Sequence, residues 1–237
     1  MKNFFIVAFS LFIFINSAQA DIAKNCPQFT SNGVPTYKAQ PGDQELCKKN
    51  YAVIHRCSVK APVAVFEHLT RESMTGLAKR KNNFKPDPEV TPQCRASLAD
   101  YKTIGSTHDR GHMAPAANNT QSADIMSESF LLSNMVPQVA NNNRGIWKQL
   151  ETWERQWALQ GGDFYIISGA IYDTGYKVTG NGLGIPTRLY KIIHDKQSNR
   201  TMAYMMPNDK LPVADLPKYQ VSLEAVEQAT GFKFNFK

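Results

Sequence analysis

The chain has 237 residues, 42% of them hydrophobic, and a formal net charge of +7 from 27 basic and 20 acidic residues. No internal repeat, low-complexity block or dividing linker interrupts it, which excludes a repeat protein and favours one domain over residues 21–237. The positive charge suits a polyanionic partner such as nucleic acid, but it also suits an ordinary basic soluble protein, because net charge does not determine fold or activity.

Residues 1–20 have the pattern of a secretory signal. Lys2 precedes the apolar run "FFIVAFSLFIFI", and "NSAQA" places small residues before Asp21. The alternative is a membrane anchor, but the run is shorter than the ~20 residues that a spanning helix needs. We therefore expect export to the periplasm or the cell exterior, cleavage before Asp21, a mature net charge of +6 and no stable membrane association.

Four cysteines lie in the N-terminal half, at Cys26, Cys47, Cys57 and Cys94. An even number in an exported chain predicts two disulfides, and three pairings remain open. Zinc binding is the rival interpretation, but the chain lacks the C-x-x-C pair typical of such sites. Residues 21–50 are rich in Pro, Gly, Asn and Lys, which predicts an irregular arm held by disulfides.

The next segments predict strands, a long loop and a polar cluster. Two strand-like runs flank Pro62, and residues 75–93 ("TGLAKRKNNFKPDPEVTPQ") form a basic loop whose length indicates function. The cluster "THDRGHMAPAANN" follows, with His108 and His112 four residues apart, the spacing of two metal ligands on one helix. Gly105, Gly111 and Pro115 disfavour such a helix, so the sequence does not predict a zinc pair here.

A strand-sized run, "SFLLSNMVPQ", precedes the clearest helix, over residues 143–162. The helix has an apolar stripe of Ile146, Leu150, Trp153 and Trp157 and an adjacent polar edge of Asn143, Glu151 and Arg155. An exposed face with a simple Glu151–Arg155 ion pair would give the same polar pattern.

The last third of the chain predicts three strands and a short helix. The strands are "DFYIISGAIY", "PTRLYKIIHD" and "TMAYMMPND", and the helix "VSLEAVEQATG" has Ser222 as N-cap and Gly231 as its stop. Strands and helices do not alternate regularly. The predicted fold class is therefore α+β, with a mixed or antiparallel central β-sheet flanked by helices.

The motifs in this order resemble the ββα-metal nucleases, specifically the DNA/RNA non-specific endonuclease family. "DRGHMAPAAN", "FLLSNMVPQ", "NNNRGIWKQLE" and the upstream "NNFKPDP" carry the resemblance. It continues more weakly through "YIISGAIY", "IPTRLYK" and "VSLEAVEQATGFKF", so it covers nearly the whole mature chain. It implies a ββα-metal nuclease fold.

The resemblance also implies roles for individual residues. His112 matches the general base, and Asn143 matches the one direct protein ligand of Mg²⁺, with Mn²⁺ or another divalent ion as alternatives. Glu151 matches an acidic residue that holds metal-bound waters. Asn134 matches a polar position near these waters and the substrate, and Arg155 matches a basic residue near the scissile phosphate.

The upstream arginine of the family matches less clearly. Arg80 and Lys81 both precede "NNFKPDP", and we favour Arg80 because lysine does not reproduce the guanidinium fork. Asp109 and Arg110 are expected to brace the loop that aims His112, and Gly111 is expected to allow a close backbone turn.

Phosphodiester hydrolysis needs an attacking water, a base and positive charge around the phosphate. A neutral imidazole suits the base role near neutral pH. The resemblance thus implies a Mg²⁺-dependent endonuclease that cleaves DNA and RNA and leaves 5′-phosphates, and the pattern of residues 1–20 implies that it is exported. The alternatives are a nucleic-acid-binding protein without catalysis and a hydrolase with a cysteine nucleophile. The sequence leaves the preference between DNA and RNA, and a homodimer, open.

Overall fold

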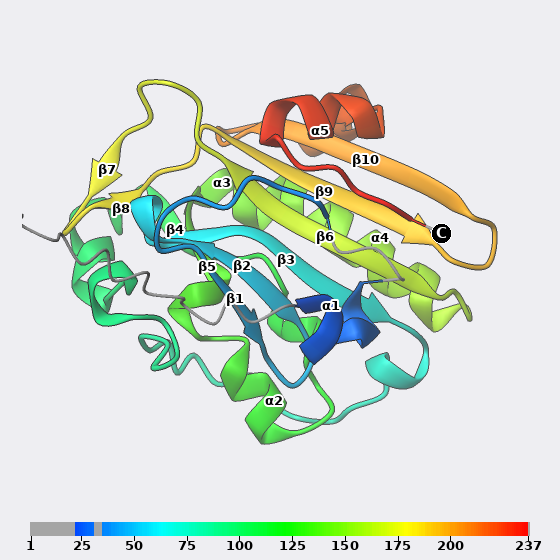
Figure 1. Cartoon of the computed structure of the whole chain (residues 1–237). Coiled ribbons are helices and arrows are strands. Elements are labelled where there is room, and N and C mark those ends of the chain that lie inside the picture. Colours follow the sequence, from blue (N-terminus) through cyan, green and yellow to red (C-terminus); the bar gives the residue numbers. More distant parts are fainter. Residues whose placement is uncertain (1–21, 31–34, 237) are drawn as a thin grey trace, which may run out of the picture.

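The structure is a computed structural model that describes residues 22–30 and 35–236, so the expected signal and its cleavage site lie outside the described residues. Its centre is a seven-stranded sheet in the order β1-β2-β3-β6-β9-β10-β11, and every pairing in it is antiparallel (Figure 1). The strands are β1 (Gln44–Cys47), β2 (Ala52–Arg56), β3 (Ala61–Leu69), β6 (Phe164–Ile171), β9 (Arg188–Asp195), β10 (Arg200–Pro207) and β11 (Gln220–Val221).

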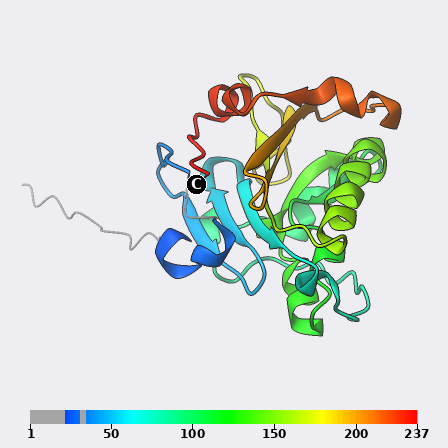
Figure 2. The ribbon, with the colours of Figure 1, turned by 90° about the vertical axis from the view of Figure 1, so that its right-hand side faces the viewer.

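The central strands are buried on both faces. All eight residues of β6 are buried, which explains why this strand reads as a continuous apolar run and not as an alternating one. Figure 2 shows α4 (Lys148–Leu159) on one side of the sheet and α1 (Ile22–Asn25) on the other. The predicted α+β class is confirmed, with an antiparallel sheet.

The remaining helices are short. The C-terminal helix α5 (Leu223–Thr230) has the expected ends, since the Ser222 hydroxyl accepts a hydrogen bond from the backbone of Ala225 and Gly231 adopts a φ of 72°. Helix α2 (Ala123–Glu128) was not predicted. Short 3₁₀ turns occur at Pro27–Phe29, Cys57–Val59, Glu72–Met74, Pro92–Cys94, Leu98–Ile104, Ala116–Asn118, Leu132–Asn134 and Val213–Tyr219.

A ββα unit packs beside the central sheet. It consists of the antiparallel pair β4 (His108–His112) and β5 (Met135–Val139), followed by α3 (Ala140–Asn142), a π-helical turn (Asn143–Trp147) and α4. A further small pair is formed by β7 (Val178–Thr179) and β8 (Leu183–Gly184). "DRGH" is thus in a strand, which agrees with the expectation that it forms no helix.

The helix predicted over residues 143–162 differs in its first turn. Residues Asn143–Trp147 are π-helical, and such turns are frequent at functional sites. The apolar stripe is confirmed at Ile146 and Leu150, which are fully buried. Glu154 is also fully buried, and the sequence pattern did not predict this.

Three other local predictions need correction. The arm over residues 21–50 is not wholly irregular, because it contains α1 and the sheet strand β1. The break between the next two strands falls at Cys57–Val59, and Pro62 lies inside β3 opposite a register shift in β2, where a missing N–H is tolerated. The run over residues 129–138 starts as a 3₁₀ turn before it becomes β5.

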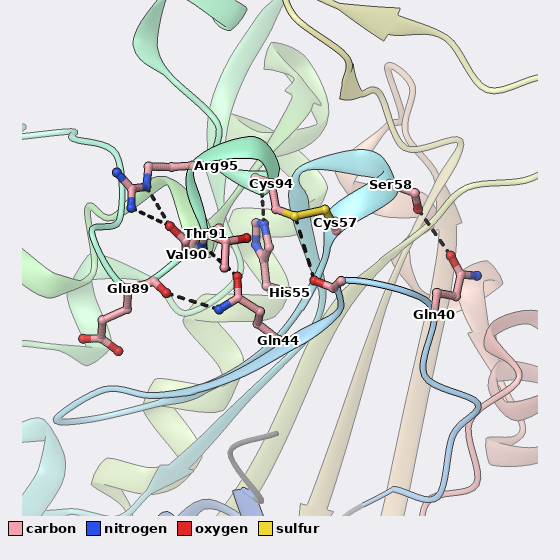
Figure 3. The surroundings of a disulfide bond; sticks show 11 residues. Gln40, Gln44, His55, Cys57, Ser58, Glu89, Val90, Thr91, Cys94 and Arg95 are labelled. Atoms are coloured by element: carbon pink, nitrogen blue, oxygen red, sulfur yellow. Dashed lines mark hydrogen bonds between the residues drawn. A yellow bond between two sulfur atoms is a disulfide. The ribbon is translucent and has the colours of Figure 1, made fainter. Parts of the chain in front are cut away.

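Both predicted disulfides are present, as Cys26–Cys47 and Cys57–Cys94. Figure 3 shows the second bond, next to which the buried His55 ring lies 3.0 Å from the carbonyl oxygen of Cys94. All four cysteines are paired, so a cysteine nucleophile is excluded. No helix among the described residues is long and apolar enough to cross a membrane.

Candidate active site

The residues that the sequence singled out converge on one cavity of about 640 Å³. It lies between the loop after β3, the end of β4, the segment after β4 and the start of α4. Its walls contain five predicted site residues that are far apart in the sequence, namely Arg80, His112, Asn143, Glu151 and Arg155. The other lining residues are Asn82, Phe84, Asp109, Arg110, Pro115, Ala116, Ala117, Arg144 and Lys148.

His112 is the last residue of β4 and is only 8% exposed. The rings of Phe84 and Phe130 meet its imidazole edge-on, at centroid distances of 5.7 and 5.0 Å. Burial, together with the charges of Arg80 and Arg110, lowers the pKa of His112 to about 3. The imidazole is therefore neutral near neutral pH, and its buried Nε2 has no hydrogen-bond partner among the described residues. A neutral imidazole with an unbonded ring nitrogen can accept a proton.

Three arginines in the cavity wall have no carboxylate within 4.0 Å in the described part of the chain. The guanidinium of Arg80 lies 5.0 Å from the Phe130 ring centroid, and that of Arg110 lies 4.2 Å from the Phe84 centroid. Arg155 donates to the side-chain oxygen of Asn118 at 3.4 Å. Aromatic rings and amides hold a guanidinium without neutralising it, so the cavity keeps positive charge for a phosphate.

Asn143 is oriented by Asp109. Its side-chain amide nitrogen donates to Asp109 Oδ2 at 2.8 Å, and Arg144 donates to both oxygens of the same carboxylate. Burial alone would raise the pKa of Asp109, but the hydrogen bonds from Arg144 and Asn143 lower it. Because an ionised carboxylate only accepts hydrogen bonds, the amide oxygen of Asn143 must point away from Asp109.

Glu151 adds a second oxygen donor to the wall. Burial raises the pKa of Glu151 to about 7, with Lys191 acting against this shift and Glu154 adding to it. No group of three or more His, Cys, Asp or Glu side chains in the described residues could enclose a metal. One amide oxygen with a nearby carboxylate still fits Mg²⁺, which prefers oxygen ligands and keeps several of its waters.

The comparisons with known proteins agree with this geometry. A family model for DNA/RNA non-specific endonucleases matches residues 28–237. The chain belongs to the DNA/RNA non-specific endonuclease family. It is 34% identical to human mitochondrial nuclease EXOG over 212 residues, which are 81% of this chain and 57% of that protein. It is 37% identical to nuclease C1 of Cunninghamella echinulata var. echinulata over 207 residues, which are 80% and 81% of the two chains.

The structural comparison confirms the ββα-metal nuclease fold. The match is to a crystal structure of the EndoG/EndoGI complex, with a TM-score of 0.74 and 32% identity over 83% of this chain and 87% of the other. The chain spans little more than half the length of the vertebrate EXOG relatives that it matches.

The structure corrects the expected position of Asn134 in this family member. Asn134 is fully buried and does not line the cavity. Its side chain accepts from the backbone N–H of Ala114 at 2.8 Å and donates to the carbonyl oxygens of Ala114 and Ser129 at 2.9 Å. With its polar atoms bonded to backbone, Asn134 fixes the segment after His112 and does not line the cavity.

The expected roles of the residues before His112 also change. Asp109 braces Asn143 directly, and Arg110 lies over Phe84 in the cavity wall. Gly111 forms no turn. It lies within β4, where a Cβ atom would come within 2.1 Å of the Gln138 side chain, so glycine is required by close packing.

The cavity residues that sequence reasoning missed include Arg144, Lys148 and Phe84. Lys148 lies three residues before Glu151 on the same helix, a spacing that could have placed it on the polar edge. Of the two candidates before "NNFKPDP", Arg80 lines the cavity and Lys81 does not. His108 is also outside the cavity wall and contacts the Thr107 hydroxyl instead.

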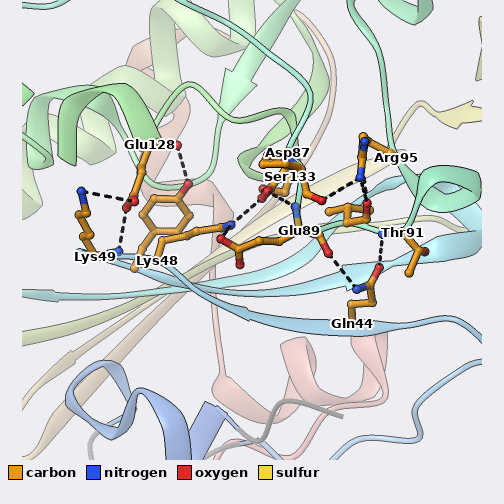
Figure 4. Close-up of polar contacts among 12 residues, drawn as sticks. Gln44, Lys48, Lys49, Asp87, Glu89, Thr91, Arg95, Glu128 and Ser133 are labelled. Atoms are coloured by element: carbon orange, nitrogen blue, oxygen red, sulfur yellow. Dashed lines mark hydrogen bonds and ion pairs between the residues drawn. The ribbon is translucent and has the colours of Figure 1, made fainter. Parts of the chain in front are cut away.

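The loop that carries Arg80 and Phe84 is fixed behind the cavity. The buried Asp87 carboxylate contacts Lys48 Nζ at 2.9 Å and accepts from the Ser133 hydroxyl at 2.5 Å (Figure 4). The disulfide to Cys94 holds the end of the same loop. These anchors explain how a long loop can supply one wall of a defined site.

Proposed function

We propose that the protein is a divalent-metal-dependent endonuclease that hydrolyses DNA and RNA without sequence preference. The observation that carries the proposal is the cavity in which a neutral imidazole faces three arginines without carboxylate partners. Contacts to backbone phosphates are the same for every base, so they give affinity without sequence preference and make binding sensitive to salt.

In this mechanism His112 Nε2 accepts a proton from the attacking water, whose oxygen forms the new bond to phosphorus. The bond from phosphorus to the 3′ oxygen breaks and leaves a 5′-phosphate, and the departing 3′ oxygen takes up a proton from water to become a 3′-hydroxyl. Arg80 and Arg155 stabilise the negative charge that develops on the phosphate. Lys148 and Arg110 add positive charge to the same wall.

Asn143 and Glu151 are the residues proposed to hold the metal, Asn143 through its amide oxygen and Glu151 through metal-bound waters. A bound Mg²⁺ would polarise the phosphate and stabilise the leaving oxygen. Asp109 keeps the amide oxygen of Asn143 directed away from itself, and an ionised Glu151 accepts hydrogen bonds from waters. Mn²⁺ has similar ligand preferences and could replace Mg²⁺.

We further propose export to the periplasm or the cell exterior. The sequence pattern of residues 1–20 supports it, and so do two disulfides, which persist in oxidising compartments. Several relatives are named as mitochondrial nucleases. The proposal of export therefore rests on this chain's own sequence and disulfides and not on its relatives. Fractionation of cells that express the full chain would test export, and retention in the cytoplasm would contradict it.

The function itself is tested by incubating the purified protein with supercoiled plasmid and with RNA, with and without EDTA. We expect both substrates to be cleaved in Mg²⁺ and neither in EDTA. Binding to both without cleavage would support the alternative of a nucleic-acid-binding protein. Cleavage unaffected by EDTA would contradict the metal mechanism.

A further inference from the structure

A cluster of polar side chains is buried behind the cavity. It consists of Glu67 on β3, Asn118 after β4, Glu154 on α4 and Lys191 on β9, and we call it the buried quartet. Glu67 is 1% exposed and the other three are fully buried. None of them lines the cavity. Burying such groups is costly unless they are paired, so their contacts need an explanation.

The hydrogen bonds of the buried quartet define its charges. Lys191 Nζ donates to Glu154 Oε2 at 2.9 Å. The side-chain nitrogen of Asn118 lies 3.1 Å from Glu67 Oε1 and 3.2 Å from Glu154 Oε1. Burial and the charge of Glu154 raise the pKa of Glu67 well above its usual range. The charge of Glu154 is paired with that of Lys191.

This arrangement fixes the orientation of the Asn118 amide. Its nitrogen donates to two carboxyl oxygens, so the oxygen must point in the opposite direction. There it accepts the hydrogen bond from Arg155 Nη1. Arg155 also donates from Nη2 to the Thr152 hydroxyl, at 3.3 Å. Both acceptors are uncharged, so they orient the guanidinium without neutralising it.

We propose that Asn118 is a positioning residue that holds the Arg155 guanidinium in the cavity wall, with its own amide orientation set by Glu67 and Glu154. The inference rests on the proposed function, in which Arg155 contacts the phosphate. It assigns a role in the reaction to a residue that does not reach the cavity.

A double-mutant cycle tests the inference, using Asn118→Ala, Arg155→Ala and the double variant. A hydrogen bond to a charged group is worth roughly a ten- to hundredfold change in rate. We expect Asn118→Ala to lower kcat on plasmid DNA by about tenfold or more with little change in KM. In the Arg155→Ala background the same substitution should have no further effect on kcat. If Asn118 only stabilised the fold, Asn118→Ala would still lower kcat when Arg155 is absent.

Asn119 provides a matched control in the same segment. It is also fully buried, and its amide donates to Pro115 and accepts from Asn50, but it does not contact Arg155. Asn119→Ala should lower the Tm without lowering kcat in the folded protein. Asn118→Ala removes the donor to one oxygen of Glu67 and to one oxygen of Glu154, which keeps its bond from Lys191. The cycle is therefore also run in a Glu67→Gln background, which removes one of the two carboxyl groups.

Several outcomes would overturn the inference. It fails if folded Asn118→Ala keeps the wild-type kcat, or if it lowers kcat by the same factor with and without Arg155. An inactive wild-type protein, or full activity of Arg155→Ala, would instead contradict the proposed function on which the inference rests. The two failures are therefore distinguishable.

Discussion

The carboxylate of Asp109 accepts a hydrogen bond of 2.8 Å from the side-chain nitrogen of Asn143, which lies 34 residues later in the chain. The contact joins strand β4 to the π-helical turn that precedes α4. It determines which atom of Asn143 is free to bind a cation. The proposed metal site therefore depends on a residue that need not touch the metal.

Asp109→Asn should weaken metal binding. The new amide can donate to Asn143, so the orientation of the Asn143 amide is no longer fixed. Residues that orient a metal ligand typically contribute about ten- to hundredfold in affinity. We expect a loss of this size for Mn²⁺ measured by calorimetry, with the fold intact by circular dichroism.

Asp173 is the matched control for this variant. It also accepts two hydrogen bonds from one arginine, Arg188, but it lies outside the cavity wall. Asp173→Asn should leave the Mn²⁺ affinity unchanged. Equal affinities of wild type and Asp109→Asn would contradict the role of Asp109.

The pKa of Glu151, raised to about 7 by burial, predicts a pH-dependent metal affinity. Glu151 is ionised only above its pKa, so affinity for Mg²⁺ should increase as the pH rises through about 7. His112, with a pKa of about 3, is neutral across this range and should not contribute. Glu151→Gln should bind Mg²⁺ more weakly than wild type. Its affinity should not change with pH over roughly one unit on either side of pH 7. A slope that persists in this variant would show that another group is responsible.

Arg80→Ala should lower kcat strongly, whereas Lys81→Ala should change it little. Only Arg80 lines the cavity, where its guanidinium lies against Phe130. Arg80→Lys should recover only part of the activity because an ammonium group lacks the planar fork. Steady-state kinetics on one oligonucleotide at fixed salt distinguish these variants. An equal loss of kcat in Arg80→Ala and Lys81→Ala would contradict the assignment.

The sequence predicted the main helices and strands better than the surroundings of the site residues. Helix α5 and the central strands follow from local signals, such as the Ser222 cap and runs of apolar residues. Four residues that the resemblance indicated line one cavity, namely His112, Asn143, Glu151 and Arg155. It did not reveal the environment that sets their pKa values, because Phe84 and Phe130 reach His112 only through tertiary packing.

Asn134 and Glu154 show why the rest was not predictable. Asn134 lies in a family motif, but its amide is used to hold backbone groups about twenty residues away in the chain. The sequence pattern of the helix does not distinguish Glu154 from an exposed glutamate. In the structure Glu154 is buried and paired with Lys191 of β9. Neither partner can be identified from spacing within one element.

Glu67→Gln should change how stability depends on pH. Burial raises the pKa of Glu67 in the folded protein, so its contribution to the free energy of unfolding is complete below the unfolded value of ~4.3 and is lost as the pH rises toward the folded value. Glutamine does not titrate. The Tm of the variant relative to wild type should therefore increase from acid to alkaline pH.

The exposed Glu224 provides a control for this measurement. The pKa of Glu224 is lowered by hydrogen bonds to its own backbone and to Ser222, so Glu224→Gln should not gain stability relative to wild type as the pH rises. A Tm difference for Glu67→Gln that is constant with pH would contradict a raised pKa of Glu67.

The most direct measurement is plasmid cleavage in Mg²⁺ by wild type, His112→Ala and His108→Ala, with folding checked by Tm. Only His112 has its Nε2 buried without a partner in the cavity wall, while His108 lies outside that wall. We predict that wild type and His108→Ala convert supercoiled plasmid to nicked and linear forms and that folded His112→Ala does not. Wild-type cleavage by folded His112→Ala would contradict the account.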